Sequence, residues 1–357
     1  MRILLFALCF ISGEFCLAQQ HKTENLIIVT LDGMRWQEVF GGIDSQIVVN
    51  KKFTRDSANI ETEFGSPSRN ERRQKLFPFL WNITATQGQI IGDRLNGSEV
   101  NNANRYKFSY PGYNEIFTGF PDTAVNSNDK IKNSNTNVLE LIQKQQGYKG
   151  QIAVFSTWDV FPYILNKWRN GIYVNADVDS LKFDNSALKL INDMQFLEAK
   201  PLDIRLDLLT YFAAREYLKA YKPKVLYIAF DETDDFAHAG LYDQYLKSAH
   251  AEDAMMNNLW NIVQSIPDYR DKTTLIITCD HGRGDIVKDQ WTDHGEDIPD
   301  AGHIWIAAIG PDTKAKGIVK TTVPIYQKQI ASTLAALLGF HFVPDQGTAE
   351  PIKSIYY

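Results

Sequence analysis

LIIVTLDG, residues 26–33, decides the fold, because a β-branched, apolar run ends there in an aspartate and a glycine. The run Leu26–Thr30 is short for a helix, and its composition predicts a strand buried on both faces. Four further segments have the same character, and we predict a strand in each. They are Gln151–Phe155, Val225–Phe230, Thr274–Thr278 and Ile304–Ile309.

Segments with helical periodicity separate these predicted strands. They are Asn137–Gln145, Leu206–Ala220, Tyr242–Ile266 and Ile325–Leu338. Strands that alternate with helices are typical of a parallel sheet with helices on both faces. We therefore predict an α/β, doubly wound fold with a mostly parallel central sheet.

The composition is that of a globular protein. Of 357 residues, 44% are hydrophobic and 22% are charged, and the formal net charge is −6. This acidic balance argues against binding to duplex nucleic acid.

Neither a repeat nor a low-complexity linker divides the chain, so we expect one catalytic domain over residues 19–357. Two polar stretches, near residues 41–75 and 96–107, are expected to be loop insertions.

The first 18 residues resemble a removable export signal. Met1-Arg2 precedes the apolar run Ile3–Ile11, and the segment ends at Leu17-Ala18. A core helix is the alternative, and the run is too short to span a bilayer. We expect an exported protein, periplasmic or extracellular, without a transmembrane segment after cleavage. The mature chain would keep one cysteine, Cys279, and could form no intramolecular disulfide.

Acidic and histidine residues follow the carboxyl ends of three predicted strands. They are Asp32, Asp231, Asp234, His238, Asp280, His281 and, slightly later, His294. Ligands of open parallel sheets bind outside these strand ends, so the side chains should converge. Mixed oxygen and nitrogen donors favour zinc, manganese or iron over calcium or magnesium. Taken singly, each aspartate could be a helix cap and each histidine a structural residue. The set taken together predicts a metal centre.

Five sequence blocks carry a family resemblance. They are Thr30-Leu31-Asp32-Gly33, Ser109-Tyr110-Pro111-Gly112-Tyr113-Asn114-Glu115-Ile116-Phe117-Thr118-Gly119, Asp234-x-x-x-His238, Thr278-Cys279-Asp280-His281-Gly282 and His294-Gly295. In this order they resemble the alkaline phosphatase superfamily, and most of all its type I phosphodiesterase and nucleotide pyrophosphatase branch. The resemblance extends from Asp32 to about Leu338.

The resemblance implies two divalent metal ions, usually zinc in this branch, with manganese as the alternative. It implies that the first ion is held by Asp32, Asp280 and His281. The second would be held by Asp234, His238 and His294. Two such ions stabilise the attacking and leaving oxygens of a phosphoryl group during displacement.

One position departs from the family pattern. The family presents a Thr or Ser nucleophile at a helix start ahead of a Thr-Gly pair, and we expect Asn114 at the equivalent position. An amide cannot be phosphorylated, so we expect Asn114 to ligate a metal while metal-bound hydroxide attacks directly. The hydroxyl of Ser109, Tyr113 or Thr118 could replace the missing nucleophile only if the alignment with the family pattern were shifted along the chain. A third alternative is binding without turnover.

Three basic residues are candidates for contacts with the substrate. Arg35 and Arg283 follow the metal-ligand blocks, and Lys130 follows Thr118-Gly119. A guanidinium can bind a phosphate through two parallel hydrogen bonds. The alternatives are a surface ion pair for each arginine and a solvated loop for Lys130.

These observations predict an exported, two-metal hydrolase of phosphoric esters that resembles a phosphodiesterase or nucleotide pyrophosphatase. We expect its substrate to be a small-molecule or glycan-linked phosphoester. One alternative is a phosphatase or another phosphoryl-transfer enzyme of the superfamily. The other is a non-catalytic protein that binds an anion or glycan through its metal ions. A sulfatase is disfavoured, because we find no Cys/Ser-x-Pro-x-Arg segment in the expected region.

Overall fold

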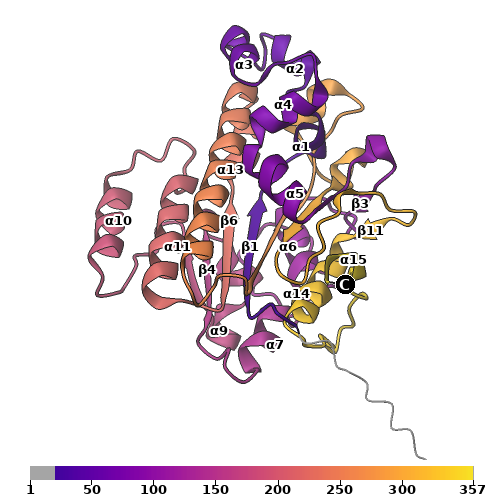
Figure 1. The fold of residues 1–357 in the computed structure, drawn as a ribbon. Helices are drawn as coiled ribbons and strands as arrows, with labels where there is room; N and C mark the ends of the chain where they lie inside the picture. Colours follow the sequence, from indigo (N-terminus) through magenta and orange to yellow (C-terminus); the bar gives the residue numbers. More distant parts are fainter. Residues whose placement is uncertain (1–20, 357) are drawn as a thin grey trace, which may run out of the picture.

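The computed structural model describes residues 21–356, and these residues surround an eight-stranded sheet (Figure 1). Its strand order is β10-β2-β9-β7-β1-β6-β4-β5. The bounds are β10 (Gly317–Val319), β2 (Gln89–Ile91), β9 (Ile306–Ile309), β7 (Thr273–Thr278), β1 (Asn25–Leu31), β6 (Val225–Phe230), β4 (Ile152–Ser156) and β5 (Tyr173–Ala176).

The sheet is mostly parallel, as predicted. Strand β1 pairs in parallel with both β6 and β7, and only β9 runs against its neighbours. All seven residues of β1 are buried, because helices cover both faces of the strand. The predicted α/β, doubly wound fold is confirmed.

Helices lie on both sides of this sheet (Figure 1). On one side are α10 (Ser186–Leu197), α11 (Asp207–Tyr221), α12 (Glu232–His238) and α13 (Tyr242–Ser265). On the other are α6 (Ser109–Thr118), α7 (Val138–Lys144), α8 (Phe161–Ile164), α9 (Lys167–Asn170), α14 (Ile330–Leu337) and α15 (Lys353–Tyr356), while α5 (Ala85–Gln87) precedes β2. The helices predicted over Asn137–Gln145, Leu206–Ala220 and Tyr242–Ile266 correspond to α7, α11 and α13, and their ends agree within two residues.

Residues 41–75 are helical, which corrects the expectation of a loop insertion. They form the end of α1 (Trp36–Gly41), then α2 (Ser45–Val49), α3 (Ser57–Phe64) and most of α4 (Arg69–Leu76). The side chains of Asp44, Asp56 and Ser68 cap the last three helices by accepting backbone N–H groups. These helices lie beyond the carboxyl ends of β1 and β6 (Figure 1).

Two other predicted elements are divided in the structure. The segment 304–309 is interrupted at Trp305, so that β8 (His303–Ile304) joins a second sheet with β3 (Val100–Asn101) and β11 (Ile325–Tyr326). The Trp305 indole donates to the Met34 carbonyl at 3.0 Å and fixes this crossing. The predicted helix over 325–338 begins as β11, and α14 starts only at Ile330. Residues 96–107 hold little regular structure beyond β3, as expected.

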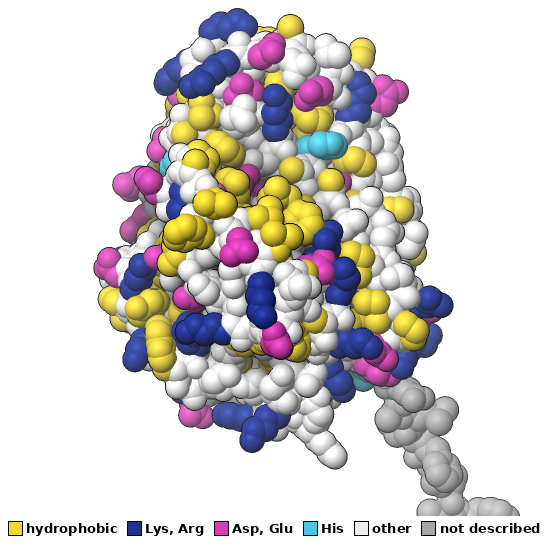
Figure 2. Space-filling view, turned by 90° about the vertical axis from the view of Figure 1, so that its left-hand side faces the viewer, with side chains coloured by type: hydrophobic (Ala, Val, Ile, Leu, Met, Phe, Trp, Pro, Cys, Tyr) yellow, Lys and Arg dark blue, Asp and Glu magenta, His cyan; other side chains and the backbone are white. Residues whose placement is uncertain are grey.

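The outer face of α10 is partly apolar. Leu190, Met194 and Leu197 lie on one exposed stripe, and Phe196 is 88% exposed. Figure 2 shows this side of the molecule, on which hydrophobic, basic and acidic side chains are interspersed.

Within residues 21–356, no helix is long and apolar enough to span a membrane. The predicted export signal, residues 1–18, lies outside the described residues.

Candidate metal centre

The carboxyl ends of three adjacent strands bring the predicted ligands together. Because β1 lies between β6 and β7 and all three are parallel, their ends share one edge of the sheet. Asp32 follows β1, Asp280 and His281 follow β7, and α12 begins directly after β6. The structure thus brings Asp32, Asp234, Asp280, His281 and His294 close together, and Asp231 belongs to neither group of possible ligands.

The first cluster consists of Asp32, Asp280 and His281, all fully buried. The Nε2 atom of His281 lies 3.3 Å from Asp32 Oδ1 and 3.3 Å from Asp280 Oδ2. Neither carboxylate oxygen has a hydrogen-bond partner among the described residues. Buried carboxylates without partners are costly, and a bound cation would remove that cost. The donors therefore fit a metal ion.

The second cluster consists of Asp234, His238 and His294. His238 Nε2 lies 3.1 Å from Asp234 Oδ2 and 2.9 Å from His294 Nε2. Asp234 and His238 face each other because residues four apart lie on one side of α12. The His238 side chain is 44% exposed, so this cluster is the one open to solvent.

The two clusters are adjacent. His281 Nε2 lies 3.8 Å from Asp234 Oδ1, and the His281 and His294 rings are 4.0 Å apart. Asp234, His281 and His294 also form a set whose ligand atoms lie within 4.8 Å of one another. Gly33 permits this proximity, because a Cβ there would lie 2.6 Å from Asp234 Oδ1. Two neighbouring ions could occupy such a centre.

Burial and the neighbouring charges shift the pKa values of residues in both clusters. Burial raises the pKa of Asp280 well above its usual value, and the Asp32 carboxylate raises it further. Burial lowers the pKa of His281, but Asp280 and Asp32 outweigh it and raise the value to about 9. Burial and the charge of His281 lower the pKa of His294 to about 2.

Ser109 is the hydroxyl residue that lies beside the clusters. It is the first residue of α6, and its Oγ lies 3.5 Å from His281 Nε2. The helix can start there because Gly112 has no side chain, and a Cβ at this position would lie 2.5 Å from the Asp280 carbonyl oxygen. The positive end of the α6 dipole thus faces the metal centre, which favours an anion.

Asn114 lies elsewhere, which corrects the expectation that it ligates a metal. Its Oδ1 accepts hydrogen bonds from Asn133 at 3.0 Å and Asn135 at 3.2 Å, while its Nδ2 donates to the Phe120 carbonyl at 2.8 Å. Asn114 lies five residues after Ser109, and over five residues an α-helix turns by about 140° and rises by about 7.5 Å. Asn114 therefore points away from Ser109 and holds the loop that follows α6.

The three basic residues predicted to bind substrate are all held by carboxylates. Fully buried Arg35 pairs with Asp285 at 2.6 Å and with Glu38 at 3.3 Å, and its pKa is raised although burial opposes this. Lys130 is half exposed and pairs with Asp159. Lys130 thus lies in an exposed loop, in agreement with the solvated-loop alternative, whereas Arg35 lies in a buried charge network and not in the surface ion pair given as its alternative.

Arg283 has a structural connection to the second cluster. Its guanidinium contacts the Asp234 carboxylate and donates to the Thr292 carbonyl at 2.5 Å. Burial raises the pKa of Asp234, but Arg283 and the two nearby histidines outweigh it and hold the value well below its usual range. Arg283 therefore joins α12 to the loop that carries His294.

Several supporting residues were not predicted. Gln327 donates to the Asp280 carbonyl at 2.7 Å, and Asn102 donates to the same oxygen at 2.8 Å. The Thr233 hydroxyl donates to the Asp32 carbonyl at 2.7 Å. Gln327 and Asn102 lie 47 and 178 residues from Asp280 in the sequence, so no local pattern could have indicated these contacts.

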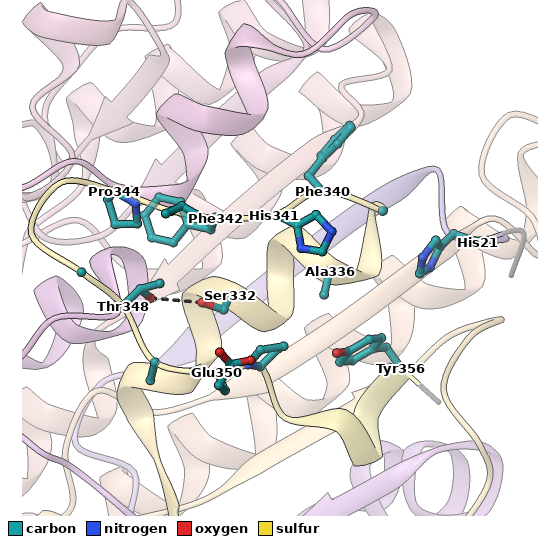
Figure 3. Close-up of a pocket in the computed structure, with 15 residues that line it drawn as sticks. His21, Ser332, Ala336, Phe340, His341, Phe342, Pro344, Thr348, Glu350 and Tyr356 are labelled. Carbon is teal, nitrogen blue, oxygen red and sulfur yellow. Dashed lines mark hydrogen bonds between the residues drawn. The ribbon is translucent and has the colours of Figure 1, made fainter. Parts of the chain in front are cut away.

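A separate cavity of about 800 Å³ lies beside α14 (Figure 3). His21, Phe340, His341, Phe342, Glu350 and Tyr356 are among its lining residues. At its wall the hydroxyls of Ser332 and Thr348 hydrogen-bond to each other at 3.1 Å. None of the predicted site residues lines this cavity, so we place the chemistry at the strand ends instead.

Comparison with known proteins agrees with a metal centre. The family model described as the metalloenzyme superfamily matches residues 208–327, which contain five of the seven predicted metal ligands. No curated protein matches the chain in sequence.

Solved structures share the fold. Alkaline phosphatase PafA is 10% identical with a TM-score of 0.62, over 94% of this chain and 99% of PafA. The lipoteichoic acid synthase LtaP from Listeria monocytogenes is 13% identical with a TM-score of 0.61, over 94% and 77%. Phosphonate monoester hydrolase of Agrobacterium radiobacter is 13% identical with a TM-score of 0.57, over 93% and 77%. The architecture is therefore alkaline phosphatase-like.

Proposed function

We propose, from the metalloenzyme-superfamily segment and the alkaline phosphatase-like fold of this chain, that it is a two-metal hydrolase of phosphoric esters. The observation that carries this proposal is the position of Ser109, whose Oγ lies 3.5 Å from His281 at the junction of two ligand clusters. A hydroxyl, paired carboxylates and histidines, and a helix N-terminus converge on one point. This is the arrangement expected for phosphoryl transfer.

The donor set is suited to zinc, with manganese as the alternative. Each cluster offers carboxylate oxygens and imidazole nitrogens, and two carboxylate oxygens of the first cluster have no other partner. Asp32, Asp280 and His281 would hold one ion, and Asp234, His238 and His294 the other. Bound ions would neutralise charge on the phosphoryl oxygens and lower the pKa of a hydroxyl in the site.

The residues of the chain define two chemical steps. In the first, Ser109 Oγ loses its proton to solvent and forms a bond to phosphorus on the side opposite the leaving alcohol, whose oxygen departs with the electrons of the broken bond and takes up a proton. In the second, water loses a proton and forms a bond to phosphorus, the bond from phosphorus to Ser109 Oγ breaks, Ser109 regains a proton, and the phosphate monoester left from the diester is released. The N-terminus of α6 stabilises negative charge near Ser109 through both steps. This route replaces direct hydroxide attack assisted by Asn114.

A diester is the preferred substrate class in this proposal. Each of the three basic residues, Arg35, Lys130 and Arg283, forms an ion pair with a carboxylate. None of the three is therefore free to pair with the second negative charge that a phosphate monoester carries. For a sulfatase the relevant segment is Ser109-Tyr110-Pro111-Gly112-Tyr113, which matches Ser-x-Pro but has Tyr113 where the pattern requires Arg. We therefore retain the phosphoester assignment, with a small-molecule or glycan-linked substrate.

Turnover of three chromogenic esters tests this assignment. We expect metal-free protein supplied with zinc or manganese to hydrolyse bis-p-nitrophenyl phosphate with a kcat/KM about tenfold above that for p-nitrophenyl phosphate, and to leave p-nitrophenyl sulfate intact. The tenfold ratio corresponds to about 1.4 kcal/mol of transition-state discrimination. Asp280→Asn is the inactive control. No turnover of any ester with either metal would favour the metal-dependent binding protein instead.

Export is part of the same proposal. The apolar run Ile3–Ile11 and the Leu17-Ala18 boundary support cleavage near Gln19. We expect intact-mass measurement of exported protein to give a chain that begins near Gln19. Exported protein that retains Met1 would contradict the signal assignment.

A further inference from the structure

Tyr113 connects the helix of the proposed nucleophile to a metal ligand. Its hydroxyl donates to Asp32 Oδ2 at 2.8 Å, and its side chain is fully buried. The ring packs edge-on against Phe161, with centroids 4.6 Å apart, which restricts its rotation. Tyr113 therefore holds a defined orientation at the base of the first ligand cluster.

This hydrogen bond orients the Asp32 carboxylate. With Oδ2 bound to Tyr113, the other oxygen, Oδ1, is directed to His281 Nε2 at 3.3 Å and has no hydrogen-bond partner among the described residues. Asp32 thus offers a single oxygen to a cation. A neutral phenol also leaves the full negative charge of the carboxylate available, which a positively charged donor would not.

We infer that Tyr113 is a positioning residue that fixes Asp32 for metal binding and sets its distance from the nucleophile. The inference rests on the proposed function, because it assumes a cation at Asp32. Tyr113 lies four residues after Ser109, on the same face of α6. One rigid helix therefore carries both the attacking hydroxyl and the group that orients a ligand of the adjacent ion.

Tyr113→Phe tests this inference by metal affinity rather than by activity. We expect competition with a chelator to show that one of two ions is bound about 10- to 100-fold more weakly, as for other groups that hydrogen-bond to metal ligands. The second ion should keep its affinity. Circular dichroism and gel filtration would verify that the variant is folded.

Tyr110→Phe is the matched control. Tyr110 lies on the same helix and is also buried, but its hydroxyl donates to the Ile131 carbonyl and has no contact with a ligand. We expect this variant to bind both ions like the wild-type protein. Equal weakening by Tyr110→Phe, or unchanged affinity in Tyr113→Phe, would overturn the role of Tyr113.

The outcomes separate this inference from the proposed function. A wild-type protein that binds two ions but hydrolyses no ester would refute the function, and the Tyr113→Phe comparison could still be made. A wild-type enzyme that hydrolyses esters while Tyr113→Phe retains both ions would refute only the inference.

Discussion

Ser109→Ala should reduce turnover of a phosphodiester by about 10⁴-fold or more, because removal of a nucleophile leaves only the other contributions of the site. The metal content of the variant should be unchanged, since Ser109 belongs to neither ligand cluster. Steady-state kinetics together with elemental analysis measure both quantities. In the wild-type enzyme, acid quenching during turnover should trap a phosphorylated peptide that contains Ser109.

The stereochemistry at phosphorus provides an independent measurement. Two displacements through a phosphoserine give net retention of configuration in a chiral phosphorothioate diester, whereas direct attack by hydroxide gives inversion. We expect retention. Inversion, combined with near wild-type turnover by Ser109→Ala, would restore the direct-hydroxide mechanism.

Asn114→Ala is the matched control for Ser109→Ala, because both residues lie on α6. Asn114 is buried and its amide makes hydrogen bonds to Asn133, Asn135 and Phe120. We expect the free energy of unfolding to fall by about 1–3 kcal/mol, the typical cost of buried polar groups left without partners. Turnover per folded molecule and metal content should stay near wild-type values.

Removal of the metal ions should lower kcat/KM by about a thousandfold or more, since charge stabilisation by metal ions contributes several kcal/mol to phosphoryl transfer. It should also destabilise the fold. At a free metal concentration 1,000-fold above the dissociation constant, each ion should stabilise the folded state by about 4 kcal/mol. Thermal unfolding before and after dialysis against a chelator measures this effect, and added zinc should reverse it.

His238→Ala isolates one of the two ions. Among the described residues, His238 contacts Asp234 and His294 but no member of the first cluster, so the variant should retain about one ion per chain. His250→Ala is the control, because that imidazole hydrogen-bonds to the Leu76 carbonyl and packs against Phe64, away from the site. Wild-type protein that contains no metal, even after zinc is added, would exclude the dinuclear centre.

Local sequence patterns predicted the framework of the site. The apolar runs of β1, β4, β6, β7 and β9 were recognisable, whereas β2, β5 and β10 were not predicted. Parallel strands place their carboxyl ends at one edge of a sheet. Asp32, Asp234, Asp280 and His281 could therefore be placed together before any contact was known. The spacing of Asp234 and His238 followed from helical geometry.

Local patterns could not identify which residue of a helix faces the site. The family's Pro-x-x-Thr or Pro-x-x-Ser pattern selected Asn114, which is the third residue after Pro111, but the rotation of α6 and the close approach allowed by Gly112 place Ser109 at the clusters. Residues 41–75 likewise read as polar loops, although side-chain caps and burial of one apolar face make them helical.

The sequence by itself determined the strands, their alternation with helices and the residue types at the strand ends, because periodicity and composition report on burial within a single element. Only the tertiary structure decided the partners of each polar side chain. Arg35 and Arg283 have the same chemistry, but one pairs with Asp285 and the other with Asp234, each across about 50 residues or more of chain. Such contacts depend on how remote segments pack, and no local pattern encodes them.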